Sequence, residues 1–396
     1  MAGDLATVDV GGKRVLVRED LNVPLDGGRI TDDTRIDAAV PTLRDLAVRG
    51  AKVIVMSHLG RPNGQVVEAL RMAPVATVLS ERLGIQVKTA PDCVGPRAKA
   101  AVDALDDGDV LLLENLRFHK EEEAGDEAFA RDLASLGDIY VDDAFGTAHR
   151  AHASTSVIAK YLPSYMGPLM ARELEMLDAI LEHPKRPFVA VLGGAKVADK
   201  IEVIDRLLSI CDAIVVGGGM ANTFLAAEGK PIGRSLCDPD LKPALNVLDA
   251  VKHHKAKAKL HVPKDAIVAK SLAADVDTRD VKISDVQADD MILDIGAGTA
   301  MDYRGVILGA HTVLWNGPMG VFENDLFAAG TEAVGQAIVD SGALSVVGGG
   351  DSAAAAHKLG FADKMTFIST GGGATIEYIE GKDLPGVAAL RDAKTA

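Results

Sequence analysis

Five arginines in the first half of the chain lie in polar turns that follow predicted strands or begin a predicted helix. They are Arg18, Arg35, Arg61, Arg117 and Arg150. Guanidinium groups donate paired hydrogen bonds to phosphate and carboxylate oxygens. Taken jointly, these turns predict a basic site for a small molecule with phosphate and hydroxyl groups. Asp20 and Asn22, which follow the first predicted strand, would be its hydrogen-bonding partners.

The second half of the chain replaces arginine with lysine and glycine-rich turns. The turns read LGGAKVADK from Leu192, WNGPMG from Trp315, VGGGDS from Val347 and TGGGAT from Thr370. Glycine turns at helix N-termini present backbone N–H groups to phosphate. A second anion, held by a different chemistry, is therefore expected in this half.

Three residues of these turns carry specific predictions. Lys196 and Lys200 are four residues apart, which places both on one face of a predicted helix. Such lysines repel each other unless a polyanion lies between them, so they indicate phosphate binding; a solvated helix face is the alternative. Asp351 is either a helix cap or the ligand of a magnesium ion on nucleotide phosphates.

Other classes of function fit the residues less well. The GxxxxGK[ST] phosphate loop is absent from the sequence. A dinucleotide fingerprint begins at Gly296 and Gly298 but has Met301 at its third position, which disfavours a dehydrogenase. A protein that binds anions without catalysis stays open, and each loop arginine alone is also consistent with a surface salt bridge, which contributes about 0–1 kcal/mol.

Short apolar runs that alternate with helical stretches predict the elements that position these turns. Buried strands of a parallel sheet read as continuous apolar runs, and open sheets of this kind bind ligands at the carboxyl ends of their strands. We predict two doubly wound, Rossmann-like α/β domains joined by an amphipathic helix within residues 163–183. The predicted strands are Arg14–Arg18, Lys52–Ser57, Val110–Glu114, Ile139–Asp142, Phe188–Leu192, Ala213–Val216, Thr312–Trp315, Ser345–Val347 and Thr366–Ile368.

Composition narrows the cellular setting. The 396 residues have a formal net charge of −15, which disfavours general nucleic-acid binding. The three cysteines have no metal-ligand spacing and form no disulfide framework. The sequence also shows no signal peptide and no apolar run of membrane-spanning length. We expect a cytoplasmic monomer without nucleic-acid or membrane partners.

Nine motifs of this chain, in order, resemble those of the phosphoglycerate kinase family. They are VREDLNVP, DDTRI, SHLGRP, LLLENLRF, VDDAFGTAHRAHAS, LGGAKVADK, WNGPMGVFE, VGGGDSAAA and STGGGAT. The resemblance implies reversible transfer of a phosphoryl group from 1,3-bisphosphoglycerate to ADP, with Mg²⁺. It implies a 3-phosphoglycerate domain at residues 1–170, a Mg-nucleotide domain at 171–376, and a tail at 377–396 that packs back on the first domain. GAGT at Gly296–Thr299 lacks the family's proline, and Ile292 replaces a glycine, so no adenosine contact is transferred to either.

The resemblance also implies a role for each site residue. Catalysis would involve Arg35, Lys196 and Gly372. Substrate would be bound by Asp20, Leu21, Asn22, Arg35, His58, Leu59, Gly60, Arg61, Arg117 and Arg150. Nucleotide would be bound by Lys196, Lys200, Asn316, Glu323, Gly349, Gly350, Asp351 and Ser352, with Asp351 as the magnesium ligand.

The chemistry of the implied reaction agrees with these residue types. A carboxylate acceptor is already ionised near neutral pH, so no general base is required. Catalysis would then depend on positioning and on charge stabilisation of the transferring group. We expect hinge closure to bring Arg35 and Lys196 to that group and to exclude water.

Overall fold

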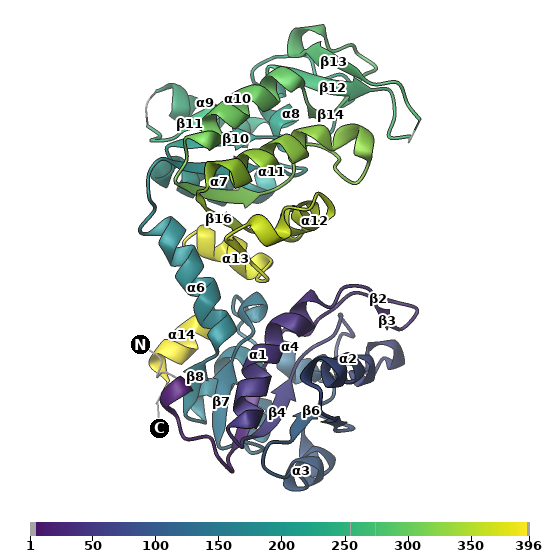
Figure 1. Cartoon of the computed structure of the whole chain (residues 1–396), viewed down its shortest axis with the longest axis vertical. Helices are drawn as coiled ribbons and strands as arrows, with labels where there is room; N and C mark the ends of the chain where they lie inside the picture. The colour runs from purple at the N-terminus through teal and green to yellow at the C-terminus, as the bar shows by residue number, and fades with distance from the viewer. Residues whose placement is uncertain (1–4, 254, 274, 394–396) are drawn as a thin grey trace. The chain divides into compact units, whose positions relative to one another are not determined.

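The computed structural model describes residues 5–253, 255–273 and 275–393 (Figure 1). The chain divides into two compact units. Unit 1 extends to Leu174 and resumes at Lys382, and unit 2 is Glu175–Gly381. The predicted domain limits also include residues 1–4 and 394–396, which lie outside the described residues. No helix among the described residues is long and apolar enough to span a membrane.

Unit 1 is built on a six-stranded parallel sheet with the order β5-β6-β4-β1-β7-β8. Its strands are β1 (Arg14–Arg18), β4 (Lys52–Met56), β5 (Val87–Thr89), β6 (Val110–Leu112), β7 (Ile139–Asp142) and β8 (Ser164–Met166). The short β2 (Leu25–Asp26) and β3 (Arg29–Ile30) form a separate hairpin. Strand order changes direction at β1, so the loops after β1 and β7 diverge at the carboxyl edge.

Helices enclose this sheet. They are α1 (Thr34–Val48), α2 (Ala73–Leu83), α3 (Gly95–Asp103), α4 (Lys120–Glu123), α5 (Glu127–Ala134) and α14 (Pro385–Asp392), with α6 (Pro168–Leu181) spanning the boundary between the units. Ile36 and Leu43 of α1 and Leu79 of α2 pack in one core with β1 and β4 side chains such as Val17 and Val55. This helical layer fixes where α1 begins, and therefore where Arg35 lies.

Unit 2 contains a second six-stranded parallel sheet, ordered β11-β10-β9-β15-β16-β17. Its strands are β9 (Phe188–Leu192), β10 (Ala213–Val216), β11 (Lys259–His261), β15 (Thr312–Asn316), β16 (Leu344–Val347) and β17 (Phe367–Ile368). Every residue of β9, β10 and β15 is buried, as expected for strands covered on both faces. The order reverses between β9 and β15.

Seven helices complete the described part of unit 2 after α6. They are α7 (Ile201–Ile210), α8 (Gly218–Ala227), α9 (Lys242–Lys252), α10 (Ala297–Leu308), α11 (Ala329–Ser341), α12 (Gly350–Lys358) and α13 (Gly373–Ile379). Tyr303 of α10 and Val334 of α11 pack with Val313 and Trp315 of β15 in the main core. The two doubly wound parallel sheets confirm the predicted fold class.

The structure adds elements that the apolar runs did not predict. β12 (Asp265–Ala269), β13 (Arg279–Lys282) and β14 (Met291–Ile295) form a small antiparallel sheet. Its outer strand β13 is largely exposed and polar, so it has no apolar run to detect. β8 lies in the segment interpreted as the entry to the connecting helix, and α6 begins only at Pro168. The nine predicted strands are all present, with ends that differ by up to two residues.

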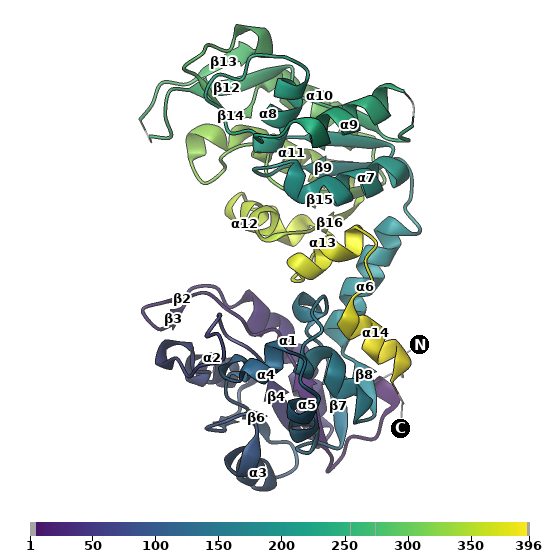
Figure 2. The same cartoon turned by 180° about the vertical axis from the view of Figure 1, so that it is seen from behind.

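The last described helix returns to unit 1 (Figure 2). The yellow α14 lies beside β8, and its Gly386 N–H donates to the carbonyl of Ala148 at 2.8 Å. Leu384, Val387 and Leu390 are buried. This end of the chain is therefore part of the packing of unit 1.

Leu390→Ala should lower the unfolding free energy of unit 1 by about 2–5 kcal/mol, because it leaves a cavity under α14. Hydrogen exchange of the β1 and β7 amides would measure this change. Trp315, the single tryptophan, lies in unit 2, so its fluorescence transition in urea should not shift. Arg391→Ala, at an exposed position of the same helix, is the control. Equal effects of the two substitutions would contradict the packing role.

Candidate active site

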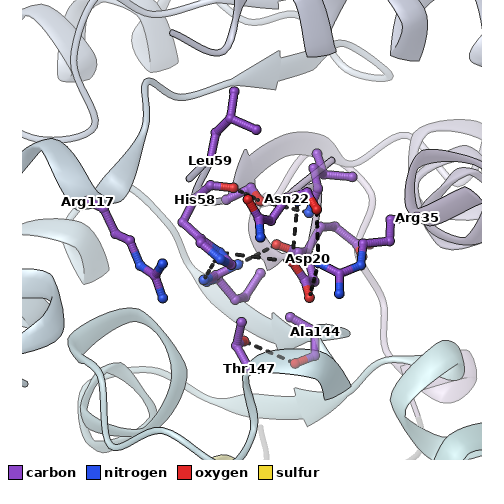
Figure 3. A network of polar contacts seen from close by, with 12 residues as sticks. Asp20, Asn22, Arg35, His58, Leu59, Arg117, Ala144 and Thr147 are labelled. Carbon is purple, nitrogen blue, oxygen red and sulfur yellow. Dashed lines mark hydrogen bonds and ion pairs between the residues drawn. The ribbon is translucent and has the colours of Figure 1, made fainter. Parts of the chain in front are cut away.

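Unit 1 gathers the predicted anion-binding residues at the carboxyl edge of its sheet, where the strand order changes direction. Asp20 and Asn22 follow β1, and His58 follows β4. Arg35 Nη1 donates to the Asp20 carboxylate at 3.1 Å and to the Asn22 carbonyl at 2.9 Å. In Figure 3 the Asp20 carboxylate lies between His58 and the Arg35 guanidinium. The loop after β1 is thus tied to the first turn of α1.

His58 is a buried, neutral member of this group. Burial lowers its pKa well below the usual value, and the charges of Arg18, Arg150 and Arg35 lower it further. Arg18 Nη2 lies 3.3 Å from His58 Nδ1, so this nitrogen accepts and Nε2 carries the proton. The 4.0 Å approach of His58 to Asp20 is consequently no ion pair. His58 can therefore offer an N–H donor to a ligand without carrying charge.

A second chain of hydrogen bonds connects the loop after β4 to the 3-10 helix η3 (Leu116–Phe118). The Gly60 N–H donates to Asn22 Oδ1 at 2.8 Å, and Arg117 Nη1 donates to the Gly60 carbonyl at 2.9 Å. Arg117 is buried, and its Nη2 has no hydrogen-bond partner among the residues that the structure describes. A buried guanidinium N–H without a partner is costly, so a ligand oxygen at this position would be stabilised.

Arg61 and Arg150 supply cationic charge at the same edge. Neither forms an ion pair within the part of the chain that the structure describes. Burial lowers the pKa of Arg150, an effect that Asp20 opposes and that Arg61, Arg18 and Arg35 reinforce. A cavity of about 400 Å³ is lined by Asn22, Val23, Pro24, Asp32 and Arg35. The site can accept an anion that neutralises several arginines at once.

Two predicted contacts, Leu21 and Leu59, have buried side chains. The Leu21 N–H donates to Ser57 Oγ at 2.9 Å, and the Leu59 N–H donates to Asn115 Oδ1 at 3.2 Å. In this structure they hold their loops in place, and their contact with substrate stays a prediction. Ser57 and Asn115 are positioning residues that the sequence patterns did not single out.

Arg18, like Arg117, is buried, whereas Arg35, Arg61 and Arg150 are partly or fully exposed. Its Nε donates to Ser154 Oγ at 2.8 Å, and Ser154 Oγ donates to Glu122 Oε1 at 2.6 Å. Arg18 also donates to the Glu19 carbonyl. Arg18 therefore supports the site from inside unit 1. No feature of its local sequence distinguishes it from the more exposed arginines of the site.

Unit 2 gathers a different set around a cavity of about 300 Å³. Its lining includes Lys200, Asn316, Gly349, Gly350, Asp351, Ser352, Gly372 and Gly373, together with Gly317 and Ile376, which were not predicted as site residues. Lys200 Nζ donates to the Gly193 carbonyl at 2.8 Å and to Asn316 Oδ1 at 2.6 Å. Burial lowers the pKa of Lys200 to about 8, against the opposing charge of Asp351. The ammonium thus lies where strand order reverses, between the ends of β9 and β15.

Backbone packing requires glycine at Gly193 but not at Gly350. A Cβ on Gly193 would lie 2.0 Å from the Pro318 carbonyl oxygen, so the loops after β9 and β15 could not approach each other. A Cβ on Gly350 would meet nothing within 4 Å, and its φ is not in the left-handed region. At Gly350 the missing side chain only leaves more open space in the cavity that this residue lines.

The structure corrects the prediction that Lys196 and Lys200 share a helical face. Residues 193–197 form an irregular turn, a 3-10 turn covers Ala198–Lys200, and α7 begins at Ile201. Asp238 Oδ2 accepts from the N–H groups of Val197 and Ala198 at 2.7 and 3.1 Å, which holds the turn open. Lys196 is exposed, forms no ion pair among the described residues, and is absent from the cavity lining, as is the exposed Glu323.

Asp351 is not the cap of α12. Gly349 occupies the cap position, and Asp351 lies exposed in the first turn with no side-chain cap bond. A single carboxylate beside an ammonium and glycine turns fits a magnesium ion that arrives on phosphate oxygens. It does not fit a protein-only magnesium cage, because no group of three possible ligands surrounds it among the described residues.

Comparisons with known proteins agree with this arrangement. A family model described as phosphoglycerate kinase matches residues 5–382. The phosphoglycerate kinase of Moorella thermoacetica is 54% identical over 388 residues, covering 98% of both chains, and that of Pelotomaculum thermopropionicum is 52% identical with similar coverage. Among solved structures, the phosphoglycerate kinase of Coxiella burnetii has a TM-score of 0.90 and 41% identity over 100% of both chains. That of Pyrococcus horikoshii has a TM-score of 0.83 and 36% identity over 98% of both.

Asp142→Asn should change how the stability of unit 1 depends on pH. Burial raises the pKa of Asp142 to about 7, although the Ala144 N–H and Arg18 oppose the shift. The folded state therefore binds its proton more tightly than the unfolded state, and this stabilisation is lost as pH rises to about 7. In the wild-type protein the release of this proton as pH rises should lower the unfolding free energy by up to about 1.4 kcal/mol per pH unit between about pH 5 and about pH 7. Asp142→Asn should remove this part of the pH dependence.

Hydrogen exchange of the β1 and β7 amides across this range would measure the slope. Asp26→Asn, at an exposed position of the same unit, is the matched control and should keep the wild-type slope. An unchanged slope in Asp142→Asn would show that this carboxyl is ionised in the folded protein.

Proposed function

Since this chain belongs to the phosphoglycerate kinase family, we propose that its two sites bind the two substrates of one phosphoryl transfer. The enzymes of this family transfer a phosphoryl group reversibly from 1,3-bisphosphoglycerate to ADP, which yields 3-phosphoglycerate and ATP. The site of unit 1 would bind the phosphoglycerate. The site of unit 2 would bind the nucleotide.

The observation that carries this assignment is the contrast between the two sites. Unit 1 offers several guanidinium groups, a neutral histidine and the Asp20 carboxylate, which suit a compact ligand with phosphate, carboxylate and hydroxyl groups. Unit 2 offers one half-buried ammonium, Lys200, among glycine turns and beside Asp351. Glycine turns without side chains suit the several phosphates of a nucleotide.

In unit 1, Asp20, Asn22 and Arg35 would bind the glycerate portion. His58, Arg61, Arg117 and Arg150 would bind its phosphate, with Gly60 holding the Arg117 guanidinium in position. The Arg117 N–H without a partner supports this role, because a phosphate oxygen would satisfy it.

In unit 2, Lys200 would bind nucleotide phosphates and Asp351 would hold Mg²⁺ on their oxygens. Magnesium would neutralise phosphate charge when bound. Asn316 and Ser352 keep the cavity in shape, since Asn316 Nδ2 donates to the Gly348 carbonyl at 2.7 Å and Ser352 Oγ accepts from the Gly317 N–H at 2.6 Å. Glu323 would contact the ribose, and the Gly372 turn would offer backbone N–H groups to the migrating phosphoryl group.

Catalysis would rest on charge and positioning, without a general base. The acceptor carboxylate is ionised already, so the protein needs only to align the reactants and stabilise the transferring group. Arg35 and Lys196 are the proposed residues for that task. Because the two sites lie in different units, turnover would require the units to close and bring the bound substrates together.

Arg35→Ala and Lys196→Ala should each lower the rate of ATP formation from 1,3-bisphosphoglycerate and ADP by about 10³-fold or more, as in related phosphoryl transfers. A coupled assay of kcat with both substrates saturating would measure the loss. Arg44→Ala on α1 and Lys242→Ala on α9 remove exposed cations elsewhere and should keep the wild-type rate. An inactive wild-type protein would defeat the proposed function.

The two variants test the catalytic roles of Arg35 and Lys196 separately from the phosphoryl-transfer activity of the protein. A Lys196→Ala enzyme within about tenfold of wild type would defeat only the catalytic role of that lysine. The same reasoning applies to Arg35. Wild-type activity in either variant would leave the phosphoryl transfer intact and move its charge stabilisation to other residues.

Binding of Mg-ADP should draw a proton onto Lys200 at alkaline pH. With its pKa at about 8, the free protein carries this amine partly neutral at pH 8, and phosphate charge would raise that pKa. We expect uptake of about half a proton per nucleotide at about pH 8 and almost none at about pH 6.5. Calorimetric titration in buffers of different ionisation enthalpy measures it.

Lys200→Met should abolish this proton uptake, and Lys196→Met is the control that should keep it. Absence of uptake in the wild-type protein at pH 8 would mean that Lys200 is fully charged before nucleotide binds.

We also propose that the enzyme acts as a cytoplasmic monomer. Its three cysteines are free in the structure, which is consistent with a reducing compartment. Sedimentation equilibrium at the assay concentration should give the mass of a single chain, about 41.4 kDa. A mass twice as large would contradict the monomer.

A further inference from the structure

A cluster of three possible metal ligands lies in unit 1, apart from the residues assigned to substrate. Asp92 and Cys93 follow β5, and His119 follows η3. One carboxylate oxygen, the Cys93 sulfur and one imidazole nitrogen all lie within 4.8 Å of one another. In the chain outside positions 1–4, 254, 274 and 394–396, no other such group of three occurs.

The structure already holds these side chains in place. His119 Nε2 lies 2.7 Å from Asp92 Oδ1, and the Cys93 N–H donates to the same oxygen at 2.7 Å. The imidazole ring packs on Phe129, with ring centroids 5.2 Å apart and an interplanar angle of 33°. Ligands whose positions are fixed before binding lose little conformational entropy when an ion arrives.

The electrostatic environment of the cluster favours a cation. The partly exposed Asp92 carboxylate lies 2.7 Å from the His119 imidazole and belongs to the residue before Cys93. Its negative charge attracts a divalent cation.

We propose that Asp92, Cys93 and His119 bind a soft divalent cation with the chemistry of Zn²⁺. Thiolate and imidazole are ligands that select zinc and similar ions over magnesium. The Asp92 and His119 side chains are 41% and 30% exposed while Cys93 is 1% exposed, so the ion has a path from solvent and an open fourth position.

Binding requires the ligand atoms, which lie within 4.8 Å of one another, to rearrange around the ion. Tetrahedral zinc with nitrogen and oxygen ligands separates those atoms by roughly 3.3 Å, so the 2.7 Å contact between Asp92 and His119 must open slightly. As the metal–sulfur bond forms, the Cys93 thiol releases its proton to solvent. The neutral imidazole coordinates through a lone pair, and no electron is transferred.

The site is linked to the loop that carries Arg117, which precedes His119 by two residues. A bound ion would connect this loop to the segment after β5. It should therefore raise the unfolding temperature of unit 1 in the full-length protein.

Co²⁺ is the probe for the test, because thiolate ligation gives it a near-ultraviolet charge-transfer band and tetrahedral geometry gives it strong visible absorption. Titration of the reduced, full-length protein should saturate at one Co²⁺ per chain, with release of about one proton per ion. Zn²⁺ should then displace the Co²⁺ and bleach both bands. A wild-type protein without the charge-transfer band would overturn the proposal.

Variants identify the ligands. Cys93→Ser should abolish the charge-transfer band, and His119→Gln and Asp92→Asn should each weaken Co²⁺ binding at least about tenfold. If Cys93→Ser fails to fold, the other two variants decide. Cys211→Ser, Cys237→Ser and Asp351→Asn are the matched controls, and all should retain the band. Loss of the band in Cys237→Ser, or unchanged binding in both His119→Gln and Asp92→Asn, would overturn the proposal.

Discussion

A parallel sheet whose strand order reverses must send the connections after two neighbouring strands to opposite faces, and the carboxyl edge between them stays open. Both units are organised around this constraint. In unit 1 it separates the loops after β1 and β7, and Arg35 ties the first of them to α1. In unit 2 it separates the ends of β9 and β15. Lys200 donates to the carbonyl of Gly193, just after β9, and to that of Asn316, the last residue of β15. The other residues of the candidate sites follow neighbouring strands, such as β4 in unit 1 and β16 in unit 2, at the same carboxyl edges.

Several buried titratable groups of unit 1 favour their uncharged forms beneath the cationic edge. Burial raises the pKa values of Glu19 and Asp142 and lowers that of His58. The buried Arg18 adds a guanidinium group 3.3 Å from His58. The exposed Arg61 and the half-buried Arg150 therefore act on a ligand together with Arg18, and the buried carboxyls oppose them little.

The sequence predicted the fold and the membership of each site better than the geometry within it. Apolar runs such as Phe188–Leu192 identify buried parallel strands, but the polar β13 has no such run and was missed. Spacing placed Lys196 on a helix, whereas the bonds that hold its turn come from Asp238, forty-one residues after Val197. Arg18 and Arg61 look alike in sequence, and only the tertiary contacts to Ser154 and His58 separate a buried support from an exposed cation. Such contacts are set by the folded backbone and leave no local signal.

The return of α14 to unit 1 has a consequence for synthesis on the ribosome. The residues from Lys382 complete the packing around Ala148, yet they emerge after all of unit 2. Nascent domains generally fold in order from the N-terminus as they leave the exit tunnel. Here the first unit to emerge is the last that can be finished, because its packing needs residues that are synthesised only after the whole of unit 2.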